Sequence, residues 1–184
     1  MKRHILIVSL VLVAISFLAD NFILNFISSS RISFLDSFFI NLAEYFNYFV
    51  IALVIGLLSI IKKSKRLLLK LGLSFISSGI IVFLLKLVIE RPRPLSNIIE
   101  VTNSSFPSGH TTIMFALFPI IYYNFNKKVG YVWLAISILV AFSRLYLGVH
   151  HLSDIFSGLI LGLIIGESII KLSSLKFRYN YEGY

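Results

Sequence analysis

The sequence contains no cysteine, and only 8 of its 184 residues are acidic, against 17 basic ones. The absence of cysteine excludes disulfides, cysteine nucleophiles and zinc–thiolate sites. The chain also lacks a long polar segment in which a second domain would fold, so we expect one domain over residues 1–184. Its formal net charge of +9 would suit a protein that binds nucleic acid. In a membrane protein, however, basic cytoplasmic loops give such a balance, and we expect no nucleic-acid partner.

Apolar residues make up 58% of the chain. Long apolar runs separated by short basic loops predict an all-α, polytopic membrane bundle. We expect six transmembrane helices, near residues 5–24, 45–61, 67–89, 107–123, 131–147 and 154–170, and a short interfacial helix within 25–42. Pro107 suits the first position of the fourth helix, and Ser153 suits the N-cap of the sixth. The first run has no small-residue cleavage site after it, so we expect it to remain as a helix.

The distribution of basic residues predicts the orientation. With a cytoplasmic N-terminus, twelve of the 17 basic residues lie inside, which agrees with the positive-inside rule. We therefore predict a multi-pass protein of the cell membrane with both termini in the cytoplasm. The remaining basic residues lie on the extracytoplasmic side; these are Arg31, Lys86, Arg91, Arg93 and Arg144.

Residues 143–154 place an arginine, two histidines and a carboxylate between apolar runs. A charge at mid-bilayer costs roughly 2.5–3.5 kcal/mol, so charges near membrane segments usually serve function. His150 and His151 precede Asp154 by four and three residues, and either would share a helix face with it. A carboxylate beside an imidazole fixes its tautomer. The alternative is that Arg144 extends to the interface and the histidines lie in a loop.

A second candidate segment is Pro107-Ser108-Gly109-His110, at the outer end of the fourth helix. A helix N-terminus attracts phosphate, and Gly109 allows a close approach to the backbone. The nearby cations Lys86, Arg93 and Arg144 imply an anionic ligand.

Together these groups predict phosphoryl transfer through a covalent histidine intermediate, with a second histidine protonating the leaving oxygen. One carboxylate among cations makes a poor Mg²⁺ site, so we expect no metal and no other cofactor. Arg91 has no place in this scheme. We interpret it as an interfacial anchor, with a second phosphate contact as the alternative.

Three motifs occur in order: Lys86-x6-Arg93-Pro94, Pro107-Ser108-Gly109-His110 and Ser143-Arg144-x5-His150-x3-Asp154. This pattern resembles the signature of the type 2 phosphatidic acid phosphatase family of lipid phosphate phosphatases, which is related to vanadium haloperoxidases. The resemblance implies that His150 is the nucleophile, Asp154 orients it and His110 is the general acid. It also implies metal-independent hydrolysis, with the phosphate bound by Lys86, Arg93, Ser108, the Gly109 amide and Arg144.

We therefore expect a lipid phosphatase that acts on a phosphomonoester or diphosphate, with undecaprenyl or another polyprenyl diphosphate as the first choice of substrate. The alternatives within this class are a phosphatidylglycerophosphate or phosphatidic acid phosphatase and a lipid phosphotransferase. A non-enzymatic anion channel or transporter would need cations along the depth of the membrane, and the predicted spans have few. Membrane lipids are the expected partners, and we expect no obligate protein partner.

Overall fold

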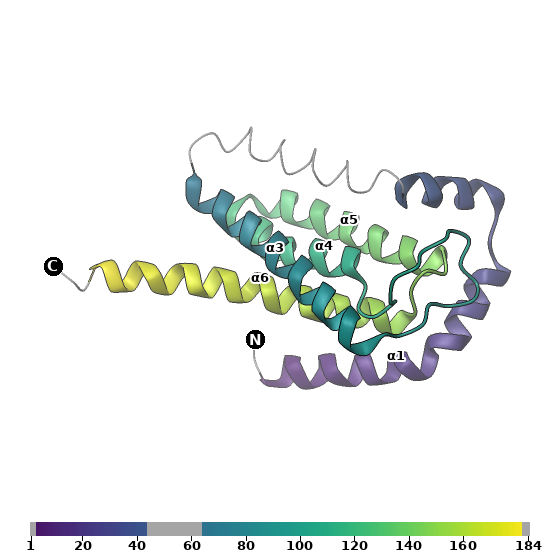
Figure 1. Cartoon of the computed structure of the whole chain (residues 1–184). Coiled ribbons are helices and arrows are strands. Elements are labelled where there is room, and N and C mark those ends of the chain that lie inside the picture. The colour runs from purple at the N-terminus through teal and green to yellow at the C-terminus, as the bar shows by residue number, and fades with distance from the viewer. Residues whose placement is uncertain (1–2, 44–63, 182–184) are drawn as a thin grey trace.

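We describe residues 3–43 and 64–181 in a computed structural model, and within them all regular structure is helical (Figure 1). The helices are α1 (Arg3–Ser29), α3 (Lys65–Ile89), α4 (Gly109–Asn124), α5 (Lys127–Tyr146) and α6 (Leu152–Tyr181), with a short apolar helix at Ser33–Ala43. Of these, α1, α3, α5 and α6 are long and apolar enough to cross a membrane. The predicted all-α membrane bundle is confirmed. The predicted second span, residues 45–61, lies outside the described residues.

Helix α4 is the centre of the bundle. It has 16 residues, a length of about 24 Å at 1.5 Å per residue, and it contacts α3, α5 and α6. Met114, Leu117 and Ile120 are at most 1% exposed. In contrast, α3 presents Phe83, which is 61% exposed, on its outer face. The apolar interior therefore lies around α4, and the exposed apolar side chains of α3 suit contact with lipid.

Glycines let α4 lie directly against α6. Gly158, Gly162 and Gly166 recur every fourth residue, and an added Cβ on each would lie 2.3–2.8 Å from a backbone oxygen of α4 or of Ser108, which precedes it. Small residues of this kind allow close helix packing in membranes. The contact continues to the start of both helices, where the Ser108 amide donates to the Asp154 carbonyl oxygen at 3.1 Å. It therefore fixes the beginning of α4 relative to the beginning of α6.

Several helix boundaries differ from the prediction. Helix α4 starts at Gly109 because Ser108 has an extended backbone (φ −69°, ψ 109°) and forms its N-cap, so the prediction that Pro107 opens the helix is wrong. Helix α6 starts one residue before Ser153, which therefore does not cap it. Instead, the Ser153 amide donates to Asp20 Oδ1 at 2.9 Å. Helix α1 continues to residue 29 and takes in the start of the predicted interfacial segment.

The ends of five helices meet on one side of the bundle. The C-terminal ends of α1, α3 and α5 lie there with the N-terminal ends of α4 and α6, and segment 90–108 folds over them (Figure 1). The connection from α5 to α6 is a tight turn in which Gly148 has φ +69°. The Ile98 amide donates to the Leu147 carbonyl oxygen at 3.1 Å and ties the covering segment to this turn. The three motifs are therefore brought to one end of the molecule.

Candidate active site

A pocket of about 260 Å³ lies among these helix ends. Its walls come from α3, α4, α5, segment 90–108 and the turn before α6. Six of the eight predicted site residues line it: Lys86, Arg93, Gly109, His110, Arg144 and His150. The other two, Ser108 and Asp154, are fully buried directly beside lining residues. The predicted residues therefore form one site, although they are spread over 69 positions from 86 to 154.

The three cations come from different elements. Lys86, in the last turn of α3, donates to the Ser104 carbonyl oxygen. Arg93 donates to the carbonyl oxygens of Asn103, at 2.8 Å, and Val149. Arg144, in the last turn of α5, is 3% exposed. Burial lowers the pKa of Arg93, and the negative charge of Asp154 opposes the effect. Because carbonyl oxygens bear no formal charge, Lys86 and Arg93 are held without losing their positive charge to a bonded carboxylate.

The start of α4 forms another wall of the pocket. Ser108 makes no capping bond with its side chain, and its hydroxyl accepts a hydrogen bond from Thr111 Oγ1 at 3.0 Å. Gly109 and His110 follow it and line the pocket. The first amides of a helix and its dipole attract an anion. The pocket therefore combines this electropositive helix end with three basic side chains.

The neighbouring residues His150 and His151 approach the same oxygen of Asp154. The Nδ1 atom of His150 lies 3.4 Å from Oδ2. That of His151 lies 3.3 Å from Oδ2, which also accepts the His151 amide at 2.8 Å. His150 lines the pocket, whereas His151 is absent from its lining. The spacing to Asp154 allowed either histidine to face the site, and the structure shows that His150 is the one that lines the pocket.

The electrostatic environment of His150 keeps its ring neutral. Burial lowers the pKa of His150 to about 4, and the nearby Asp154 carboxylate opposes this shift. The imidazole is therefore uncharged near neutral pH. If Nδ1 carries the proton towards Asp154, Nε2 keeps a lone pair for attack on an electrophile.

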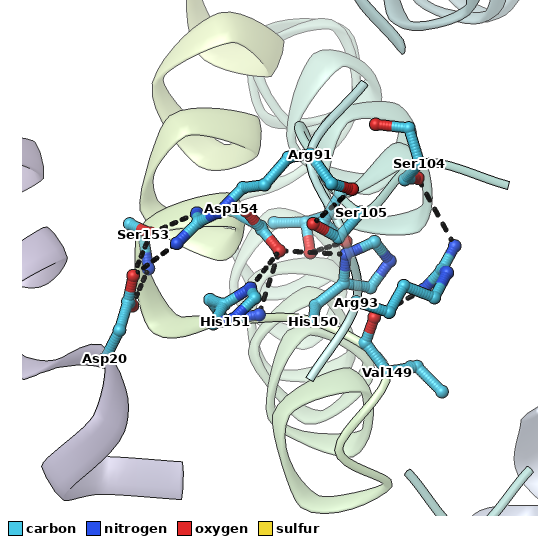
Figure 2. Close-up of polar contacts among 12 residues, drawn as sticks. Asp20, Arg91, Arg93, Ser104, Ser105, Val149, His150, His151, Ser153 and Asp154 are labelled. Atoms are coloured by element: carbon cyan, nitrogen blue, oxygen red, sulfur yellow. Dashed lines mark hydrogen bonds and ion pairs between the residues drawn. The ribbon is translucent and has the colours of Figure 1, made fainter. Parts of the chain in front are cut away.

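Arg91 does not behave as predicted. Its guanidinium points inward and bridges two carboxylates, with Nη1 2.6 Å from Asp154 Oδ1 and Nη2 2.7 Å from Asp20 Oδ2 (Figure 2). The interpretation of Arg91 as an interfacial anchor is therefore wrong. Sequence reasoning also missed Asp20, which is 4% exposed on α1. Its signal was present, because an acidic residue inside an apolar helix requires a partner.

Comparison with known proteins agrees with this arrangement. The family model described as "PAP2 superfamily" matches residues 67–178. The chain is 31% identical over 151 residues to "Undecaprenyl-diphosphatase BcrC" of Bacillus subtilis, covering 78% of this chain and 77% of the relative.

Two solved structures are also similar. One is a crystal structure of a transmembrane PAP2-type phosphatidylglycerolphosphate phosphatase from Bacillus subtilis, with a TM-score of 0.76, 26% identity and coverage of 92% of this chain and 94% of that one. The other is Aquifex aeolicus LpxE, with a TM-score of 0.73, 26% identity and coverage of 83% and 94%.

Taken with these relatives, the all-helical membrane fold and the histidine-containing pocket are those of a membrane-embedded phosphatase. The chain belongs to the PAP2 superfamily. The prediction of a membrane lipid phosphatase is thereby confirmed.

Proposed function

We propose that this phosphatase hydrolyses a polyprenyl diphosphate, with undecaprenyl diphosphate as the first choice, at the extracytoplasmic face of the cell membrane. The observation that carries the proposal is the pocket in which three cations and the start of α4 surround His150, with Asp154 behind it. The name of the Bacillus subtilis relative supports the choice of a diphosphate.

The pocket suits a two-step reaction. In the first step His150 Nε2 attacks the terminal phosphorus, the bond from phosphorus to the bridging oxygen breaks, and His110 protonates the departing lipid phosphate. In the second step His110 accepts a proton from water, whose oxygen attacks the phosphorus of the phosphohistidine. The bond from phosphorus to His150 Nε2 breaks, which frees the imidazole and releases inorganic phosphate. Lys86, Arg93 and Arg144 would stabilise the charge on the equatorial oxygens in both steps.

A second, larger pocket supports a lipid substrate. It measures about 500 Å³, shares Lys86 and Arg93 with the site, and is also lined by Phe83 and Leu87. These two apolar side chains are 61% and 56% exposed on α3. A phosphate held by the shared cations would therefore lie beside a surface suited to a hydrocarbon chain.

Two finer parts of the proposal rest on charge. The site lies at the end of the bundle opposite Lys65, Arg66, Lys127 and Lys128, and the positive-inside rule assigns those residues to the cytoplasm. Metal independence is supported by the donor set. The carboxylate of Asp154 lies next to the pocket, and its two oxygens already contact Arg91, His150 and His151. Cations occupy the positions where a Mg²⁺ site would place oxygen ligands.

The test is phosphate release by purified protein in detergent with EDTA, across a panel of polyprenyl diphosphate, phosphatidylglycerophosphate and phosphatidic acid. We expect the diphosphate to have the highest kcat/KM. His150→Ala should lower the rate about a thousandfold or more, and His110→Ala about a hundredfold or more.

His151→Ala is the matched control, because it removes the neighbouring imidazole and should change the rate less than about tenfold. Wild-type rates in His150→Ala would overturn the proposed mechanism, and loss of activity when EDTA is added would overturn metal independence. A preference for phosphatidylglycerophosphate would instead favour the activity of the structurally similar Bacillus subtilis phosphatase.

A further inference from the structure

Beside the pocket lies a buried ionic cluster that links Asp154 to three residues without a role in the reaction described above. It consists of Asp20 on α1, Arg91 in the covering segment, and Ser153 and Asp154 in the first turn of α6 (Figure 2). The carboxylates of Asp20 and Asp154 are 6% and 0% exposed, and the Arg91 side chain is 20% exposed. The guanidinium also stacks 5.0 Å from the centre of the Phe17 ring. The cluster thus joins three separate parts of the chain.

The two oxygens of Asp154 have different partners. Oδ1 accepts from Arg91 Nη1 at 2.6 Å, while Oδ2 faces the histidines, with His150 Nδ1 at 3.4 Å. A carboxylate bonded on one side has lost rotational freedom, so its other oxygen has a fixed position and direction. Arg91 on Oδ1, together with the His151 amide on Oδ2, therefore fixes where Oδ2 is presented to His150.

Asp20 in turn holds Arg91 and Ser153. Asp20 Oδ2 accepts from Arg91 Nη2 at 2.7 Å and from the Ser153 hydroxyl at 2.6 Å, and Asp20 Oδ1 accepts from the Ser153 amide at 2.9 Å. The Ser153 hydroxyl also accepts from Arg91 Nη1 at 2.7 Å. Asp20 thus bonds both the arginine and the backbone next to Asp154.

Charge gives Asp20 a second effect. Arg91 paired with Asp154 alone would cancel the negative charge that His150 experiences. With Asp20 included, two carboxylates and one guanidinium give a formal charge of −1. A negative group beside the ring favours the positive charge that His150 gains when its Nε2 bonds to phosphorus.

We propose that Asp20 and Arg91 are positioning residues for the phosphatase reaction, which hold Asp154 Oδ1, direct Oδ2 at His150 and preserve a net negative charge beside it. This rests on the proposed role of His150 as the nucleophile. Asp20 lies on α1, before the residues 67–178 that match the family model. The first helix therefore supplies a part of the active site that the three motifs do not contain.

The test uses the full-length protein in detergent, with steady-state kinetics on the polyprenyl diphosphate and thermal unfolding of each variant. We expect Asp20→Asn, which keeps the shape but removes the charge, to lower kcat roughly 10- to 100-fold with KM changed little. Asp20→Glu, which restores the charge, should recover part of that loss. Arg91→Lys should resemble Asp20→Asn, because one ammonium group cannot reproduce the two-armed contact.

Leu24→Ala is the control for a purely structural role of Asp20. Leu24 is 6% exposed on the same helix, and it belongs to the apolar cluster that contains Leu145 and Ile155, whereas the ionic contacts are made by other side chains. It should lower the unfolding temperature but keep kcat close to wild type. Equal loss of kcat in Leu24→Ala and Asp20→Asn would show that Asp20 only attaches α1, and wild-type kcat in Asp20→Asn would overturn the proposal directly. An active His150→Ala variant would instead refute the proposed nucleophile.

Discussion

At the residue scale, the site depends on how one carboxylate divides its contacts. Asp154 receives Arg91 on Oδ1 and both histidines near Oδ2. His150 differs from His151 in lining the pocket, and its burial keeps the ring neutral. The same burial that prepares the nucleophile makes its protonation costly for the folded protein.

This cost predicts a pH dependence of stability. The pKa of His150 is lowered from the ordinary value of 6.5 to about 4 in the folded protein, so the unfolded state binds more protons between those values. The free energy of unfolding should therefore fall as the pH is lowered from about 6.5 to about 4.

The measurement is the thermal unfolding temperature in detergent at pH 7, 6, 5 and 4 for wild type and His150→Gln, whose side chain does not titrate. The wild type and the variant have the other histidines in common, so the difference between their curves reports on His150. The wild type should therefore lose more stability than the variant across this range. Parallel curves would contradict the lowered pKa.

At the element scale, helix ends and the connections between them place the reacting groups. Arg144 lies in the last turn of α5 and His150 just before α6, and Gly148, in the turn between these helices, has φ +69°. An added Cβ there would lie 2.5 Å from the Ser96 carbonyl oxygen and 2.7 Å from Arg31 Nη2. The turn is thus packed against both the covering segment and Arg31, which follows α1.

We predict that Gly148→Ala destabilises the protein and lowers its activity. The left-handed conformation costs a residue with a side chain roughly 1–2 kcal/mol, and the contact with Ser96 would displace the turn that holds His150. Gly72→Ala is the matched control, because an added Cβ at Gly72 meets nothing within 4 Å. Inside helix α3 this change should be neutral or stabilising, by up to about 1 kcal/mol. Thermal unfolding and phosphate release are measured for both variants. Equal changes in unfolding temperature and activity in Gly148→Ala and Gly72→Ala would contradict the strain at Gly148.

At the scale of the whole molecule, the site occupies one end of a membrane bundle. The proposed orientation places that end outside the cell, and the absence of cysteine from the chain makes a clean labelling experiment possible. Asn97, in the covering segment, is exposed, and so is Lys128 at the opposite end of the bundle.

We predict that Asn97→Cys reacts with a membrane-impermeant thiol reagent in intact cells. Lys128→Cys should react only after the cells are permeabilised. The reverse pattern would invert the proposed topology, and would also move the phosphatase reaction to the cytoplasmic face.

Much of the site was predictable because its residues follow fixed spacings. Lys86 to Arg93 and Arg144 to Asp154 are set by local chain geometry, and the apolar runs place them at helix ends. The role of Arg91 was not predictable in this way, since its bond to Asp20 joins positions 71 residues apart and depends on how α1 packs against α6. Pro107 was misassigned because its suitability for a helix start does not reveal that Ser108 stays extended.

The location of Asp20 has a consequence for comparing distant members of this superfamily. A protein can retain all three motifs and still lack an acidic residue in its first helix. A search for the motifs would score that protein as intact, although an arginine beside the motif aspartate would then cancel the negative charge of that aspartate. Aligning first helices by a buried acidic residue, in addition to the motifs, would therefore separate members expected to turn over substrate quickly from members expected to be slow.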